Sequence, residues 1–114
     1  MDHDCAINAL RRCNGLSYTA VAGMLLRAGY TPSKGILFGN FCMVLHQHGF
    51  TLHYDCSRWL HHPMTIRDFC QRDKQGKFVL IIDGHALAVV DGKTYDNEPT
   101  NPDAAIIAAF KYPF

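Results

Sequence analysis

Apolar residues recur at helical spacing near the start of the chain. Between Asp2 and Cys13 they fall mostly three or four positions apart, which is the spacing of one buried helix face. Asp4 is a suitable N-cap, and Gly15, after Asn14, readily adopts the left-handed geometry found where helices end. The pattern predicts a helix over this segment with Cys5 in its first turn.

The helical spacing continues through the next part of the chain. Ser17 is a suitable N-cap for a second helix, which ends before Gly29. Few residues separate this helix from the first, so the two are expected to form a tight hairpin. A third helix is predicted from Ile36 to His48 and ends at Gly49.

Other patterns replace the helical one in the second half of the chain. Phe50 to Cys56 alternates between apolar and polar residues and predicts a strand. Thr65 to Gln71 predicts a short helix, in which Thr65 and Asp68 form a variant of the capping box. The segment from Ala104 to Tyr112 is compatible with a strand or, because it is rich in alanine, with a helix.

Residues 78–97 carry the most informative pattern in the chain. Two Asp-Gly pairs, Asp83-Gly84 and Asp91-Gly92, stand between runs rich in Val, Ile, Leu and Ala. Asp and Gly both tolerate positive φ, so each pair suits a two-residue type I′ turn. The segment therefore predicts an antiparallel meander. Its strands are Phe78–Ile82, His85–Val90 and Lys93–Asp96.

Helices followed by a meander predict an α+β fold in which the N-terminal helices pack on an antiparallel sheet. The length of 114 residues and the apolar content of 48% fit one globular domain over residues 1–114. Helical and alternating spacing together predict the core side chains. They are Ile7, Leu10, Val21, Leu25, Phe41, Leu45, Leu80, Ile82, Leu87 and Val89.

Charge and composition narrow the class of partner. The net charge of +1 gives no electrostatic basis for binding nucleic acid or an anionic membrane, and no apolar run is long enough to span a bilayer. The N-terminus is acidic and lacks a signal-peptide pattern, so we expect a cytoplasmic protein with reduced cysteines. Four cysteines are expected to be structural thiols without disulfides or metal. They are Cys13, Cys42, Cys56 and Cys70.

The fifth cysteine, Cys5, belongs to the candidate chemical site. A thiolate in the first turn of a helix is stabilised by the macrodipole and by unpaired N–H groups, which predicts a Cys5 pKa below the ~8.5 of free cysteine. His85 opens the middle strand of the meander and Asp96 ends the next, so their side chains can face each other. Each residue also has a purely structural explanation: Cys5 as a small apolar residue, His85 as a strand-end histidine and Asp96 as a solvated acid. Their combination favours a nucleophile with an adjacent base.

The seven histidines and five cysteines do not show the ligand spacing of a zinc site. The closest groupings are His46 with His48, His53 with Cys56, and the pair His61-His62. We interpret them as helix-end and loop histidines, and we expect neither a structural metal nor a cofactor.

The sequences DCAINAL and NGLSY near the start, and GHALAVVDGKTYDN later, resemble small phage and bacterial proteins of the papain-like cysteine peptidase superfamily. Their layout is similar to that of the bacteriocin-processing, or double-glycine leader, peptidases, and the order Cys, His, then Asp or Asn is that of the superfamily. The resemblance implies a papain-like core with Cys5 as nucleophile, His85 as base and Asp96 as orienting acid. Asn97 is the alternative third member. The resemblance also favours a strand for residues 104–112.

One feature of the superfamily is missing from the sequence. The family supplies its oxyanion hole partly from a glutamine a few residues before the cysteine, and only residues 1–4 precede Cys5 here. The Cys5 N–H is one available donor. The candidates for the second donor are His3, Asn8 and Gln47.

The leading interpretation is a cysteine hydrolase in the cytoplasm of a bacterial or phage-infected cell, acting on a peptide or amide bond of a peptide or protein substrate. Acyl transfer would use the same residues. The alternative, motivated by the missing glutamine, is a catalytically weak or inactive peptidase fold that engages a host protein.

Overall fold

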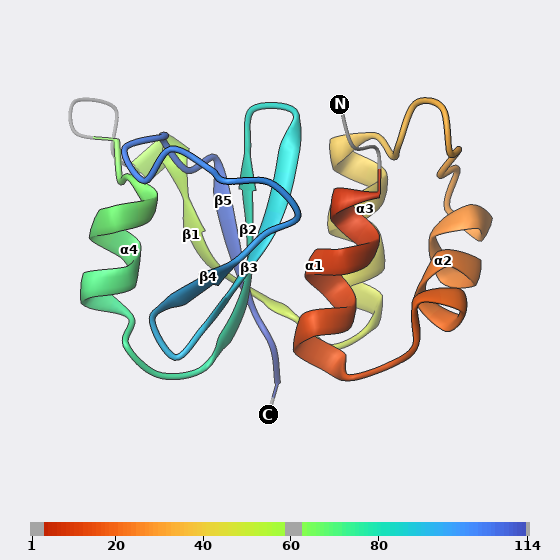
Figure 1. Ribbon diagram of the computed structural model, residues 1–114, viewed down its shortest axis with the longest axis horizontal. Helices are drawn as coiled ribbons and strands as arrows, with labels where there is room; N and C mark the ends of the chain where they lie inside the picture. The colour runs from red at the N-terminus through yellow and green to blue at the C-terminus, as the bar shows by residue number, and fades with distance from the viewer. Residues whose placement is uncertain (1–3, 59–62, 114) are drawn as a thin grey trace.

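The fold is seen in a computed structural model that describes residues 4–58 and 63–113 (Figure 1). The pair His61-His62, which is expected in a loop, and Trp59 lie outside these ranges. The helices are α1 (Cys5–Asn14), α2 (Tyr18–Arg27), α3 (Phe38–Gln47), α4 (Ile66–Arg72) and the short 3-10 helix Cys56–Arg58; the strands are β1 (Thr51–Asp55), β2 (Lys77–Ile82), β3 (His85–Val90), β4 (Lys93–Tyr95) and β5 (Ala108–Lys111).

The strands form one antiparallel sheet in the order β1-β5-β2-β3-β4. Helices α1, α2 and α3 lie on one side of the sheet, and α4 lies on the other (Figure 1). The α+β class is therefore confirmed. The alanine-rich C-terminal segment is a strand, β5, which lies between β1 and β2 and pairs with both.

The helix ends follow the local signals in the sequence, with one exception. The Ser17 side chain accepts a hydrogen bond from the Ala20 N–H, and Thr65 and Asp68 form a complete capping box. Asp4 precedes α1 but does not cap it. Its carboxylate accepts hydrogen bonds from the Tyr18 hydroxyl and the Asn97 amide instead. This carboxylate thus ties α1 to segments distant in sequence.

The two Asp-Gly turns of the meander differ. Asp91 and Gly92 have φ values of +51° and +78°, as a type I′ turn requires. At the first turn only Gly84 has a positive φ, of +67°, whereas Asp83 does not. The prediction of a type I′ turn is therefore wrong there, because that turn needs positive φ at both central residues.

The core has two parts, one on each face of the sheet. Alternation along β3 directs Ala86 and Ala88 into the cluster that contains α1, and Leu87 and Val89 into the cluster that contains α4. The small alanine side chains let α1 approach the sheet closely. All ten predicted core side chains are buried: Ile7, Leu10, Val21, Leu25, Phe41, Leu45, Leu80, Ile82, Leu87 and Val89.

Candidate active site

Cys5 is the first residue of α1 and is half-buried. Helical geometry directs the N–H groups of this first turn away from the helix, without intrahelical acceptors. Cys5 lines a cavity of about 430 Å³ together with His85, and apolar side chains from α3, the loop before it and β2 make up much of the wall. The thiol and the imidazole, which are 80 positions apart, are thus brought to one cavity.

His85 forms a close pair with Asp96. Its Nε2 lies 2.8 Å from each carboxylate oxygen of Asp96, and the two side chains are only 17% and 8% exposed. The Thr100 hydroxyl also donates a hydrogen bond to this carboxylate. The acid is therefore held from two sides and is largely shielded from water.

The strand register explains why these two residues meet. Tyr95, the last residue of β4, pairs with Ala88 on β3. Continuing the register by one residue puts Asp96 opposite Leu87, two positions from His85. Diagonal neighbours of this kind lie about 7–8 Å apart in the backbone, which a histidine and an aspartate can span.

The pairing also assigns roles to the two ring nitrogens of His85. A carboxylate that accepts a hydrogen bond from Nε2 favours the tautomer with its proton on that atom. The Nδ1 atom then carries the lone pair and can accept a proton. This arrangement is that of a general base whose ring is oriented by an acid.

Asn97 has a different partner from the one that a third catalytic member requires. Its Nδ2 donates to a carboxylate oxygen of Asp4 at 3.1 Å, and it is Asp96 that contacts His85. Asn97 therefore links the end of β4 to the residue immediately before Cys5. This link holds the start of α1 beside the His85–Asp96 pair.

Asn8 and Gln47, two of the candidates for the second oxyanion donor, lie away from the Cys5 cavity. Asn8 donates its amide hydrogen to the Asp4 carbonyl at 3.2 Å. Gln47 lines a separate cavity with Met24 and Arg27. His3 lies outside the described residues. Among the described parts of the chain, neither Asn8 nor Gln47 lines the Cys5 cavity.

All five cysteines lie within the described residues, and none of them forms a disulfide. The four cysteines other than Cys5 differ in how far they are buried. Desolvation raises the pKa of Cys13 to about 12, and burial also raises the pKa values of Cys42 and Cys70. These three thiols are therefore weak nucleophiles near neutral pH. Cys56 is a free thiol too, but it is exposed.

A second His–Asp pair was not predicted. His53 Nε2 lies 3.0 Å from a carboxylate oxygen of Asp73, with side-chain exposures of 28% and 16%. The pair joins β1 to the end of α4, and the His53 ring packs against Phe69 and Phe78. Its members are 20 positions apart on different elements, so no local pattern indicated it. It provides a matched comparison for His85–Asp96, away from the Cys5 cavity.

Comparisons of this chain with protein-family models, curated protein sequences and solved structures found no match. Within residues 4–58 and 63–113, no cluster of three or more His, Cys, Asp or Glu side chains could hold a metal ion. None of the helices in this part of the chain has the length and apolar character needed to cross a membrane.

Proposed function

We propose that the protein is a cysteine hydrolase that cleaves a peptide or amide bond through an acyl-enzyme, with Cys5 as nucleophile, His85 as general base and Asp96 as the residue that orients His85. One observation carries the proposal: His85, whose Nε2 is paired with the largely shielded carboxylate of Asp96, lines the same cavity as Cys5. The resemblance to papain-like peptidases agrees with these roles.

The reaction uses these three side chains in two stages. His85 Nδ1 takes the Cys5 proton, and the thiolate sulfur attacks the substrate carbonyl carbon. The imidazolium then gives its proton to the leaving amine as the carbon–nitrogen bond breaks, which leaves a thioester. In the second stage His85 deprotonates water, which attacks the thioester, and the thiol is restored as the acid leaves. Asp96 stabilises the imidazolium in both stages.

The cavity favours an apolar group of the substrate beside the scissile bond. Ile36, Phe41 and Ile81 are among its lining residues. A pocket of this kind stabilises a bound aliphatic or aromatic side chain by removing it from water. In this proposal, backbone N–H groups at the start of α1 donate to the oxyanion. We place the protein in the cytoplasm of a bacterial or phage-infected cell, where its thiols stay reduced.

The test is the rate at which iodoacetamide labels each cysteine, followed by peptide mass spectrometry. We expect Cys5 to react fastest near neutral pH and His85→Ala to slow it strongly. His53→Ala is the matched control, because it removes the other aspartate-paired histidine and should leave the Cys5 rate unchanged. Equal labelling of Cys5 and Cys42, or no effect of His85→Ala, would remove the basis for the proposal.

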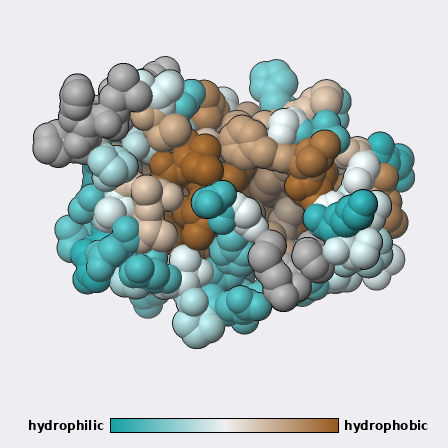
Figure 2. Space-filling view, turned by 90° about the horizontal axis from the view of Figure 1, so that it is seen from above, coloured by the Kyte–Doolittle hydropathy of each residue, from teal (hydrophilic) through white to brown (hydrophobic). Residues whose placement is uncertain are grey.

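An alternative function is the binding of a host protein by a fold that has lost activity. Two side chains at the start of α3 favour it, because Leu37 is 75% and Phe38 is 50% exposed. Figure 2 views the molecule from the end where α1 and α3 begin and shows hydrophobic surface there. In this case Leu37→Ser with Phe38→Ser would abolish partner binding, whereas Cys5→Ala would leave it intact. A Cys5 thiol of ordinary reactivity would accompany that result.

A further inference from the structure

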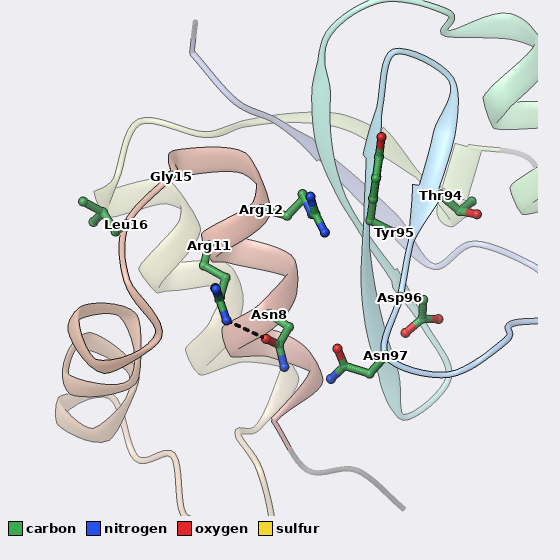
Figure 3. A pocket seen from close by; sticks show the side chains of 9 residues that line it. All are labelled: Asn8, Arg11, Arg12, Gly15, Leu16, Thr94, Tyr95, Asp96 and Asn97. Atoms are coloured by element: carbon green, nitrogen blue, oxygen red, sulfur yellow. Dashed lines mark hydrogen bonds between the residues drawn. The ribbon is translucent and has the colours of Figure 1, made fainter.

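A second hollow, of about 570 Å³, lies between α1 and the end of β4 (Figure 3). Most of its lining is polar, and it is separate from the apolar cavity at Cys5. The lining residues are Asn8, Arg11, Arg12, Gly15 and Leu16 on one side, and Thr94, Tyr95, Asp96 and Asn97 on the other.

Two exposed guanidinium groups supply the charge of this hollow. The Arg12 guanidinium lies 4.3 Å from the centre of the Tyr95 ring, and Arg11 donates to the Asn8 side-chain oxygen at 3.4 Å. Within residues 4–58 and 63–113, neither arginine forms an ion pair with a carboxylate. Among the described residues, two adjacent guanidinium groups therefore border the hollow without an ion-paired carboxylate.

Asp96, which lines the hollow, and Asp4, which is bonded to Asn97 of the lining, are already engaged. The Asp96 carboxylate is bound by His85 and Thr100, and the Asp4 carboxylate by Tyr18 and Asn97. These contacts leave the two guanidinium groups for an external anion. A guanidinium presents parallel N–H donors that match a carboxylate, and the Tyr95 ring restrains that of Arg12.

We infer that this hollow binds a carboxylate of the peptide substrate. The inference that the carboxylate belongs to a substrate rests on the proposed function; the binding of a carboxylate does not. Along α1, Asn8 lies about 5 Å and Arg12 about 10 Å beyond Cys5. An extended peptide advances about 3.4 Å per residue. The acidic residue would therefore stand roughly two or three positions from the scissile bond, on the side away from the apolar cavity.

The site is tested by titrating the ¹⁵N-labelled Cys5→Ala protein with N-acetyl-L-glutamate, N-acetyl-L-glutamine and inorganic phosphate, with amide shifts as the readout. We expect the glutamate derivative to shift the signals of Asn8, Arg12 and Tyr95, and the glutamine derivative to shift them far less. Combining Arg11→Gln with Arg12→Gln should weaken the affinity roughly tenfold. The matched control is Arg27→Gln, which removes an arginine on α2 and should leave the affinity unchanged.

Two further measurements sharpen the result. Arg12→Lys keeps the positive charge but loses the paired donors, so it should retain part of the affinity, and thermal unfolding of each variant checks that it is folded. Equal binding of the glutamine derivative, tighter binding of phosphate, or binding unaffected by the arginine substitutions would overturn the assignment.

The substrate role is tested separately with peptide electrophiles that label Cys5 in the parent protein. Two probes are compared that differ only in Glu or Gln at the third residue from the reactive group. The Glu probe should bind more tightly before reaction, and this preference should disappear in the arginine variants. Arginine-dependent carboxylate binding with an inert Cys5 would refute the proposed function and leave the site standing. A reactive Cys5 without a preference for Glu would refute the substrate role alone.

Discussion

Replacing Asp96 by Asn is the most informative single change at the candidate site. The substitution keeps the size of the side chain but removes the negative charge that faces His85 Nε2 at 2.8 Å. An amide stabilises an imidazolium less well than a carboxylate does. We therefore expect the thiolate–imidazolium pair, and with it the alkylation of Cys5 near neutral pH, to be reduced.

The size of the effect follows from the environment of the pair. Side-chain exposures of 17% for His85 and 8% for Asp96 limit screening by water. Hydrogen bonds to charged groups contribute about 1.5–3 kcal/mol, and about 1.4 kcal/mol corresponds to a tenfold change. Alkylation of Cys5 should accordingly slow roughly 10- to 100-fold. His85→Ala should slow it further, because the base itself is lost.

The assay is iodoacetamide labelling from pH 5 to 10, with the Cys5 rate expressed relative to Cys56. Cys56 is exposed and serves as an internal reference within the same molecule. The control variant is Asp73→Asn, which makes the same chemical change in the His53–Asp73 pair, where the aspartate side chain is 16% exposed. It should leave the Cys5 rate unchanged.

Two outcomes would refute this reasoning. A Cys5 rate unchanged by Asp96→Asn would show that the carboxylate does not support a catalytic base. An equal slowing by Asp73→Asn would show that loss of stability, and not the site, controls the reactivity of Cys5.

Two predictions concern stability. Burial raises the pKa of Cys13 from 9.0 to about 12. The stability that the neutral thiol contributes is therefore complete below pH 9 and is lost between pH 9 and 12, which lowers the free energy of unfolding by at most about 4 kcal/mol. Urea unfolding across this range should show a steeper loss of stability for the parent than for Cys13→Ala. Leu10→Ala should lower the free energy of unfolding by about 2–5 kcal/mol at neutral pH, because Leu10 is fully buried. Leu26→Ala, at a 55% exposed position on α2, should change it by less than about 1 kcal/mol in the same assay.

Most of the fold was predictable because short-range signals and tertiary packing agree. Ser17 caps α2, and the Thr65–Asp68 capping box begins α4. The segment that forms β5 was ambiguous because alanine favours helices in isolation, whereas here pairing with β1 and β2 decides its conformation. Asp4 was expected to cap α1, but a hydroxyl and an amide from distant segments compete for its carboxylate.

The same distinction applies to the candidate site. His85 and Asp96 flank one turn of a meander, so their meeting depends only on a local register. His53 and Asp73 meet only because β1 and α4 pack together, which alternation within either segment does not encode. The location of Gln47 relative to Cys5 depends on how α1 and α3 pack on the sheet, and sequence spacing carried no information about that.

The arrangement at Cys5 depends on contacts between the two ends of the chain. Cys5 begins α1 and His85 begins β3, so no local signal can bring them together. Ala86, the residue after His85, belongs to the core cluster that also contains side chains of α1. Its small side chain permits a close approach of the helix. The Asn97–Asp4 hydrogen bond, across 93 positions, holds the residue before Cys5 to the residue after Asp96. The start of α1 and the start of β3 are thereby held at a shared cavity, which is the condition for a thiol and an oriented imidazole to act as one unit.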